Sequence, residues 1–314
     1  MLASDLDSPL HPLLNALVDY AGLFPPAKLD MAPTVENYAR YVVSPEAWML
    51  GRLIVPVSRL DEFEEAAIDH LPRDPEAPEW RISALLVPMT DDRKMDDLQR
   101  DLERLDAFNE AHADANAGLA IIDTVEVKTD TPRAIDRVLK ALPETERAFF
   151  EIPVSDDPRG VIAAIAGTGS AAKIRTGGVT PGAIPPTEHV ARFLCACARA
   201  DVPFKATAGL HHPMRSEHNL TYETDSPRGT MHGFLNVFLA AAFAFTEGCQ
   251  APALCDLLEE RSVGGIVFDA GGVKWKQNHL TTAQIAAARE HFALSFGSCS
   301  FDEPIEDLRT LRLL

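Results

Sequence analysis

Short apolar runs alternate with segments of helical periodicity along almost the whole of this 314-residue chain. Apolar runs of this length, bounded by proline, glycine and polar residues, are typical of buried strands, and the segments between them have the spacing of amphipathic helices. The predicted strands cover residues 17–24, 52–57, 81–88, 119–127 and 147–153, the runs around Lys173 and Lys205, and residues 265–272. Eight strands that alternate with eight helices favour a single α/β domain over residues 1–314, folded as a (β/α)8 TIM barrel.

Three further segments are expected around this barrel. A polar N-terminal extension precedes the first strand, and a C-terminal tail with a short helical stretch follows the last predicted helix, residues 281–292. A long loop, residues 210–230, follows the seventh strand and has no clear period. Loops of this length in compact domains are usually functional or disordered, so this loop is a candidate lid or subunit contact.

Charge and cysteine usage exclude several classes of function. The net charge of −18 argues against nucleic acid as a partner, because phosphate binding depends on basic side chains. The longest apolar stretch, residues 234–245, is too short to span a bilayer, and the acidic N-terminus does not resemble a signal peptide. The five cysteines have no metal-site or disulfide spacing. We therefore expect a cytoplasmic protein without cofactor or metal, whose partners are a small-molecule substrate and further copies of the chain.

Two lysines occupy matched positions on the sixth and seventh predicted strands. A helix of about one crossover length separates Lys173 from Lys205, which makes their strands parallel neighbours and brings both side chains to one end of the barrel. Two ammonium groups in a partly desolvated site repel each other, so one is expected to lose its proton and become a nucleophile toward carbonyl groups. The alternative is that both lysines reach solvent or pair with acids.

Strand alternation turns further polar side chains toward the same end of the barrel. Glu126 and Glu151 face inward, where they either neutralise the lysines or transfer protons. Arg175 is expected to bind a substrate carboxylate or phosphate, or else a glutamate, and Asp269 at the end of the eighth run either contributes to the site or caps a turn. The remaining candidates for substrate binding follow the strands in polar or glycine-rich turns: Thr207, Gly177, Gly178, Gly209, His211, His212 and Gly271.

The order of these residues resembles the deoxyribose-phosphate aldolase group of class I aldolases. The similarity is carried by Glu126 on the fourth strand, by Lys173 in the run Lys-Ile-Arg-Thr-Gly, and by Lys205 in the run Phe-Lys-Ala-Thr-Ala-Gly. It implies that Lys173 forms a Schiff base, that Lys205 perturbs its pKa or shuttles a proton, and that Glu126 replaces the aspartate of the family as acid and base. The chain departs from the family at Arg175, at Ala208-Gly209 and at His211-His212.

Three functions fit these residues. The first is a Schiff-base lyase or aldolase that acts on a small carbonyl compound, with Lys173, Lys205, Glu126 and Glu151 as catalytic residues. The second is a metal-dependent isomerase or hydrolase, with a divalent ion held by Glu126, Glu151, Asp269 and one of His211, His212 or His218. The third is a barrel without chemistry that acts as a binding module.

Overall fold

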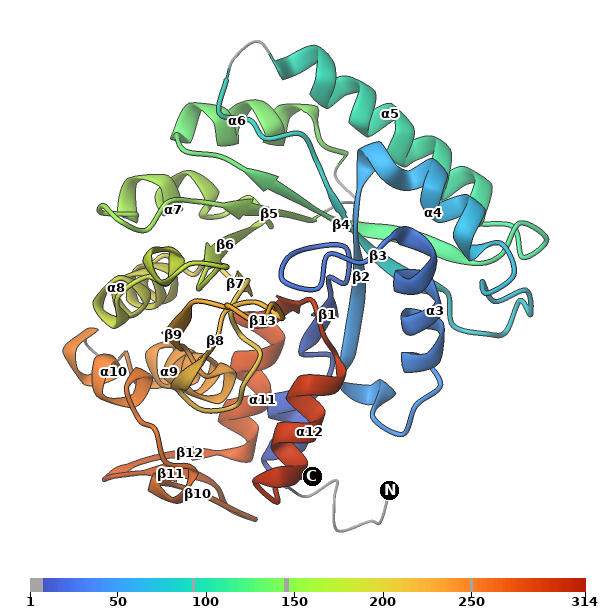
Figure 1. Cartoon of the computed structure of the whole chain (residues 1–314). Coiled ribbons are helices and arrows are strands. Elements are labelled where there is room, and N and C mark those ends of the chain that lie inside the picture. The colour runs from blue at the N-terminus through green and yellow to red at the C-terminus, as the bar shows by residue number, and fades with distance from the viewer. Residues whose placement is uncertain (1–7, 92–93, 144–146, 249–250) are drawn as a thin grey trace.

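Eight parallel strands close into a barrel in the computed structural model, which describes residues 8–91, 94–143, 147–248 and 251–314 (Figure 1). The strands follow one another around the barrel in the order β1-β13-β7-β6-β5-β4-β3-β2. Their bounds are β1 (Val18–Tyr20), β2 (Leu50–Pro56), β3 (Trp80–Leu85), β4 (Ala120–Lys128), β5 (Arg147–Glu151), β6 (Ala171–Arg175), β7 (Phe204–Thr207) and β13 (Ala293–Ser298). The predicted (β/α)8 barrel is therefore confirmed.

Helices surround the barrel and supply the crossovers between its strands (Figure 1). They are α3 (Met31–Tyr41), α4 (Leu60–Ala67), α5 (Met95–His112), α6 (Pro132–Ala141), α7 (Arg159–Ile165), α8 (Thr187–Arg199), α9 (Phe234–Glu247) and α11 (Thr282–His291). Short helices lie before, between and after them: α2 (Leu10–Leu14), α10 (Ala251–Leu258) and α12 (Asp302–Thr310), with the 3-10 turns η1 (Ala47–Met49), η2 (Val57–Arg59), η4 (Pro181–Ala183) and η5 (Val263–Gly265).

Local sequence explains where several of these helices begin and end. Thr131 caps α6 by accepting a hydrogen bond from the backbone N–H of Ala134, and Thr281 with Gln284 forms a capping box at the start of α11. The apolar helix α9 is buried along most of its length and ends at Gly248, which adopts the left-handed conformation. Among the described residues, no helix combines the length and the apolar character that crossing a membrane requires.

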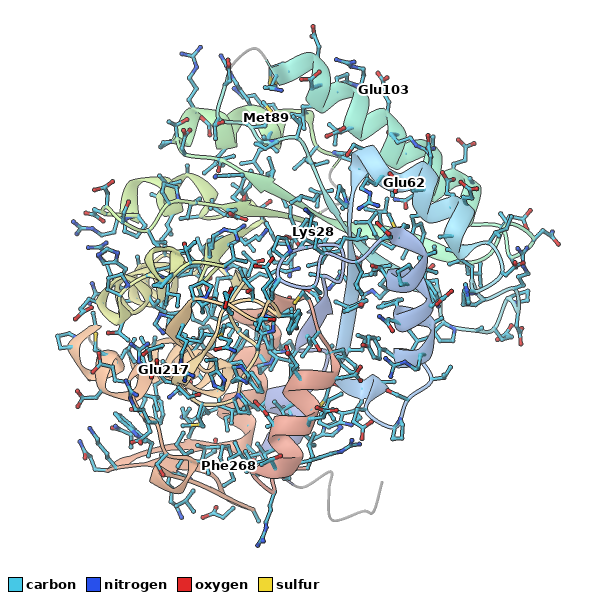
Figure 2. The ribbon with its side chains drawn as sticks, viewed as in Figure 1. Lys28, Glu62, Met89, Glu103, Glu217 and Phe268 are labelled. Carbon is cyan, nitrogen blue, oxygen red and sulfur yellow. The ribbon has the colours of Figure 1, made fainter. Side chains whose placement is uncertain are left out.

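The eighth barrel strand is not the one predicted from the sequence. Residues 266–269 form β10 (Ile266–Asp269), which pairs antiparallel with β11 (Gly272–Trp275), and β11 pairs with β12 (Asn278–Thr281). The turn at Ala270-Gly271 reverses the chain at once, whereas a parallel strand needs a long crossover before its neighbour. In Figure 2, Phe268 on β10 lies at the lower edge of the molecule, away from the barrel centre near Lys28. The barrel is closed instead by β13, in the segment predicted as the tail.

The long loop after β7 is present and contains a small hairpin. Its strands are β8 (Ser216–Asn219) and β9 (Arg228–Met231), paired antiparallel. The turn of the hairpin contacts the segment after β13, because the Tyr222 hydroxyl donates to Glu303 at 3.0 Å. This contact holds the hairpin beside the loops that follow the barrel strands.

Candidate active site

Lys173 and Lys205 are adjacent inside the barrel, as the sequence predicts. The two residues are paired positions in the register between β6 and β7. Lys173 is 3% exposed and Lys205 is 0% exposed, so both charges lie out of bulk water. A buried ammonium group is costly unless carboxylates compensate it, so the neighbours of the two lysines determine the chemistry of the site.

One carboxylate, Glu126 on β4, contacts both lysines. Its Oε2 lies 2.6 Å from the Nζ of Lys173, and its Oε1 lies 2.5 Å from the Nζ of Lys205. The Ser83 hydroxyl donates a further hydrogen bond to Oε1 at 2.8 Å. Glu126 thus separates the two ammonium groups and compensates both of them.

Each lysine also has a second carboxylate. Glu151 Oε2 lies 2.8 Å from the Nζ of Lys173, and Asp19 Oδ2 lies 2.5 Å from the Nζ of Lys205. The Nε of Arg175 lies 3.1 Å from the other oxygen of Glu151. The result is a continuous series of charges of alternating sign, which we call the ion chain: Asp19, Lys205, Glu126, Lys173, Glu151 and Arg175.

The carboxylates keep Lys173 charged in this structure. Burial alone would lower its pKa, but Glu126 and Glu151 outweigh burial and raise it. Burial likewise opposes ionisation of both glutamates. Lys173 and Lys205 nevertheless hold the pKa of Glu126 below its usual range, and Lys173 and Arg175 do the same for Glu151. The sequence predicted that crowding of the two lysines would lower the pKa of the nucleophile; at Lys173 the effect is the opposite, because Glu126 lies between the two amines.

A pocket opens above Lys173 at the carboxyl ends of the barrel strands. It has a volume of about 390 Å³ and is lined by residues of seven barrel strands, β2 to β7 and β13, and by loops that follow the strands, including the loop after β1. Of the predicted site residues, the structure places these in its wall: Glu126, Glu151, Lys173, Arg175, Gly177, Gly178, Thr207 and His211. Lys205 lies beneath this wall without lining it. The position at the carboxyl ends of the strands is where barrel enzymes carry their chemistry.

Two glycines let the loops after β6 and β7 approach each other beside the pocket. A Cβ added to Gly177 would lie 2.8 Å from the Cα of Gly209, and the reverse distance is also 2.8 Å. Gly209 in addition has a φ of +77°, which side chains disfavour. Gly209 therefore supports the pocket by packing and does not itself line it.

Three predicted residues lie elsewhere. Asp269 and Gly271 belong to the β10–β12 sheet, where Asp269 accepts hydrogen bonds from Lys274 and from the backbone N–H of Gly271. His212 contacts Asp307 at 2.6 Å and stacks on His218. Without Asp269 at the barrel mouth the predicted metal-ligand set does not assemble, and among the described residues no group of three or more His, Cys, Asp or Glu side chains could hold a metal ion.

Sequence reasoning missed Asp19, Cys299 and Glu303. Asp19 is a single acid in the apolar run of the first strand, and it reaches Lys205 because closure of the barrel places β1 two strands from β7. Cys299 follows the misassigned β13 and lines the pocket. Glu303 accepts a hydrogen bond from His211 at 2.8 Å and so fixes that imidazole at the pocket wall. An acid inside an otherwise apolar strand was the available signal for Asp19.

Fold and site together define a parallel (β/α)8 barrel with the architecture of barrel enzymes, in which a buried ion chain underlies a pocket at the carboxyl ends of the strands. Among solved structures, the chain is similar to the N-acetyl-D-glucosamine-6-phosphate deacetylase of Mycobacterium smegmatis, with 15% sequence identity, coverage of 64% of this chain and 70% of that chain, and a TM-score of 0.31. No protein-family model and no curated protein matches the chain.

Proposed function

We propose that this protein is a Schiff-base-forming lyase of the aldolase type that acts on a small carbonyl compound, with Lys173 as the nucleophile. The observation that carries the proposal is the position of Lys173 in the pocket wall, with its Nζ 2.6 Å from Glu126 and 2.8 Å from Glu151. The order of Glu126, Lys173 and Lys205, which resembles the deoxyribose-phosphate aldolase group, supports the same assignment.

The two glutamates supply the proton transfers that an amine nucleophile needs. Lys173 first passes a proton to Glu151, which contacts its Nζ, because Lys205 lowers the pKa of Glu126 and makes that carboxyl group the weaker base. The neutral amine then attacks the carbonyl carbon, a C–N bond forms, and the carbonyl oxygen leaves as water after two proton transfers. In the resulting iminium, a carboxylate removes the proton of the β-hydroxyl group, the bond between the α and β carbons breaks, and its electron pair forms an enamine while the β carbon leaves as the second carbonyl fragment. Protonation of the enamine and addition of water then release the first fragment and restore the Lys173 amine.

Lys205 is a positioning residue in this mechanism. It does not line the pocket, so it does not touch the substrate, but it contacts Glu126 at 2.5 Å on the side away from Lys173. By compensating part of the charge of Glu126, Lys205 weakens the hold of this carboxylate on the Lys173 proton. The second lysine therefore makes the first easier to deprotonate through the carboxylate between them.

The pocket favours a small substrate that carries an anionic group. Its volume of about 390 Å³ suits a short carbonyl compound. Arg175 lines it with a half-exposed side chain, and only its Nε contacts Glu151. The other guanidinium donors have no partner among the residues that the structure describes and can bind a carboxylate or phosphate. The metal-dependent alternative has no assembled ligand group among the described residues, and no observation favours it.

Reductive trapping tests this function. The protein is incubated with separate short aldehydes, keto acids and sugar phosphates, then treated with borohydride, and the intact mass is measured. A productive compound should add its own mass less one oxygen atom, because water is lost and hydride reduces the C=N bond. The addition should be absent from Lys173→Met and present in Lys276→Met, where a surface lysine is removed. If no compound gives an addition that depends on Lys173, the Schiff-base proposal is wrong.

A further inference from the structure

A second cavity lies at the opposite mouth of the barrel, at the amino ends of the strands. It has a volume of about 740 Å³ and is distinct from the pocket above Lys173. Its wall contains Arg52 near the start of β2, Arg81 near the start of β3 and Arg147 as the first residue of β5. Arg289, at the end of α11, completes a set of four arginines in this wall. These four cationic side chains lie together although the chain as a whole carries a net charge of −18.

The carboxylates of the cavity do not balance these arginines. Asp123 and Glu290 also line it, and Asp123 is shared by Arg52, whose Nε lies 2.5 Å away, and by Arg81. Arg289 is buried and uses its guanidinium on backbone carbonyls, among them Leu13 O and Asn15 O at 2.9 Å. Within the described part of the chain, Arg289 has no carboxylate contact. Among the described residues that line the cavity, four guanidinium groups thus face two carboxylates, with Asp19 behind the wall acting on Arg52 and Arg289. An anion in the cavity would relieve this imbalance.

Two polar groups on one wall of this cavity have no hydrogen-bond or ion-pair partner in the described part of the chain. Arg147 is exposed and makes no hydrogen bond or ion pair with any residue that the structure describes. The Thr124 hydroxyl is buried and likewise lacks a hydrogen-bond partner among those residues. Thr124 and Arg147 are paired positions in the register of β4 and β5, so the two unused donors come from neighbouring backbone positions. A buried polar group without a partner, such as the Thr124 hydroxyl, is rare, and a ligand is one explanation for it.

We infer that this cavity, lined by Arg52, Arg81, Thr124, Arg147 and Arg289, binds a small ligand through an oxyanion group, either phosphate or carboxylate, with Arg147 as its principal ligand. The planar guanidinium group binds both oxyanions in a bidentate manner. The inference is independent of the proposed lyase activity. The site nevertheless adjoins the ion chain, because the Ser295 hydroxyl in its wall donates to Asp19 at 2.7 Å, and Asp19 contacts Lys205.

Calorimetric titration of the full chain with pyrophosphate, inorganic phosphate and citrate, at constant ionic strength, tests this inference. The three probes separate phosphate from carboxylate as the source of the oxyanion. At least one should bind saturably to the wild type at a site whose affinity is at least tenfold weaker in Arg147→Gln and unchanged in Arg175→Gln. A separate binding event that only Arg175→Gln removes belongs to the other pocket. Arg312→Gln, an exposed site near the C-terminus, controls for the loss of one charge and should bind as the wild type does.

Three results would overturn the inference: no saturable binding of any probe, equal binding by Arg147→Gln and wild type, or a loss confined to Arg175→Gln, which would place the anion above Lys173. Arg147→Gln should keep the melting temperature of the wild type, because Arg147 is exposed and forms no hydrogen bond or ion pair with a described residue that the substitution would break. Arg81→Gln, which removes a second exposed guanidinium from the same wall, serves as the independent variant and should weaken binding in the same direction.

Discussion

Lys173 and Lys205 are paired across β6 and β7, yet their ammonium groups meet through the two oxygens of Glu126, at 2.6 Å and 2.5 Å. The arrangement gives each lysine a different task. Lys173 borders the pocket and can reach a substrate, whereas Lys205 is enclosed and acts on Lys173 through the shared carboxylate. The predictions below follow from this division.

Removal of the charge on Glu126 should destabilise the fold strongly. Glu126→Gln keeps the shape of the side chain but leaves two buried lysines with less compensating charge, and loss of one partner in a buried ion pair typically costs about 3–5 kcal/mol. Urea unfolding at neutral pH would measure the change. Glu62→Gln, which breaks an exposed pair with Arg59, should leave the free energy of unfolding nearly unchanged. Equal stability of Glu126→Gln and wild type would show that Glu126 contributes no net stabilisation.

Acid should weaken the protein through Glu126 and Glu151. Because the folded pKa of both carboxyls is lowered, their contribution to stability is present above the unfolded value of about 4.3 and is lost as pH falls toward the folded values. The free energy of unfolding of the wild type should therefore fall between about pH 5 and pH 3 more steeply than that of Glu151→Gln. Urea titrations at several pH values would check this, and parallel curves would argue against the assignment.

Lys205→Met should shift the pH dependence of trapping at Lys173 to higher pH. Without Lys205, the charge of Glu126 acts on Lys173 alone and holds its proton more firmly. The rate of reductive trapping should fall at neutral pH and recover as the pH is raised, while Lys276→Met follows the wild-type profile. If the role of Lys205 is purely structural, the variant should give less folded protein, and the pH dependence of trapping by the folded fraction should stay that of the wild type.

Arg175→Gln should discriminate between anionic and neutral substrates. If the guanidinium binds a substrate anion, the KM for an anionic carbonyl compound should rise about tenfold or more, as expected for loss of a hydrogen bond to a charged group. The KM for an uncharged analogue of the same length should change little, because Arg175 would not contact it. A matched rise for both compounds would mean that Arg175 acts on the pocket as a whole through Glu151.

The sequence predicted the barrel and the inward-facing lysines for physical reasons that the structure confirms. Parallel strands need crossovers, so the spacing of Lys173 and Lys205 around one helix fixed them as neighbours. Alternation along β4 and β5 placed Glu126 and Glu151 on the same side as Lys173. These inferences depend on the alternation of side chains along a strand and on the spacing of strands and helices, both of which can be read directly from the sequence.

The incorrect predictions concern strand pairing, which the local sequence pattern does not determine. Residues 266–269 have the composition of a barrel strand, and only their antiparallel partner β11 places them outside the barrel. The true closing strand, β13, contains serine and glycine because it faces a polar barrel interior, so its apolar pattern is weak. Asp19 could be connected to Lys205 only after β13 was placed between β1 and β7. The neutral lysine was predicted without this carboxylate and without the position of Glu126 between the two amines.

Peptide mapping of the borohydride-treated protein tests the central claim most directly. After trapping with a productive carbonyl compound, the peptides that contain Lys173 and Lys205 are separated and fragmented to locate the added mass. We expect the reduced secondary amine on Lys173 and an unmodified Lys205, because Lys173 alone of this pair borders the pocket. An adduct on Lys205, or one spread over surface lysines with Lys173 unmodified, would contradict the account.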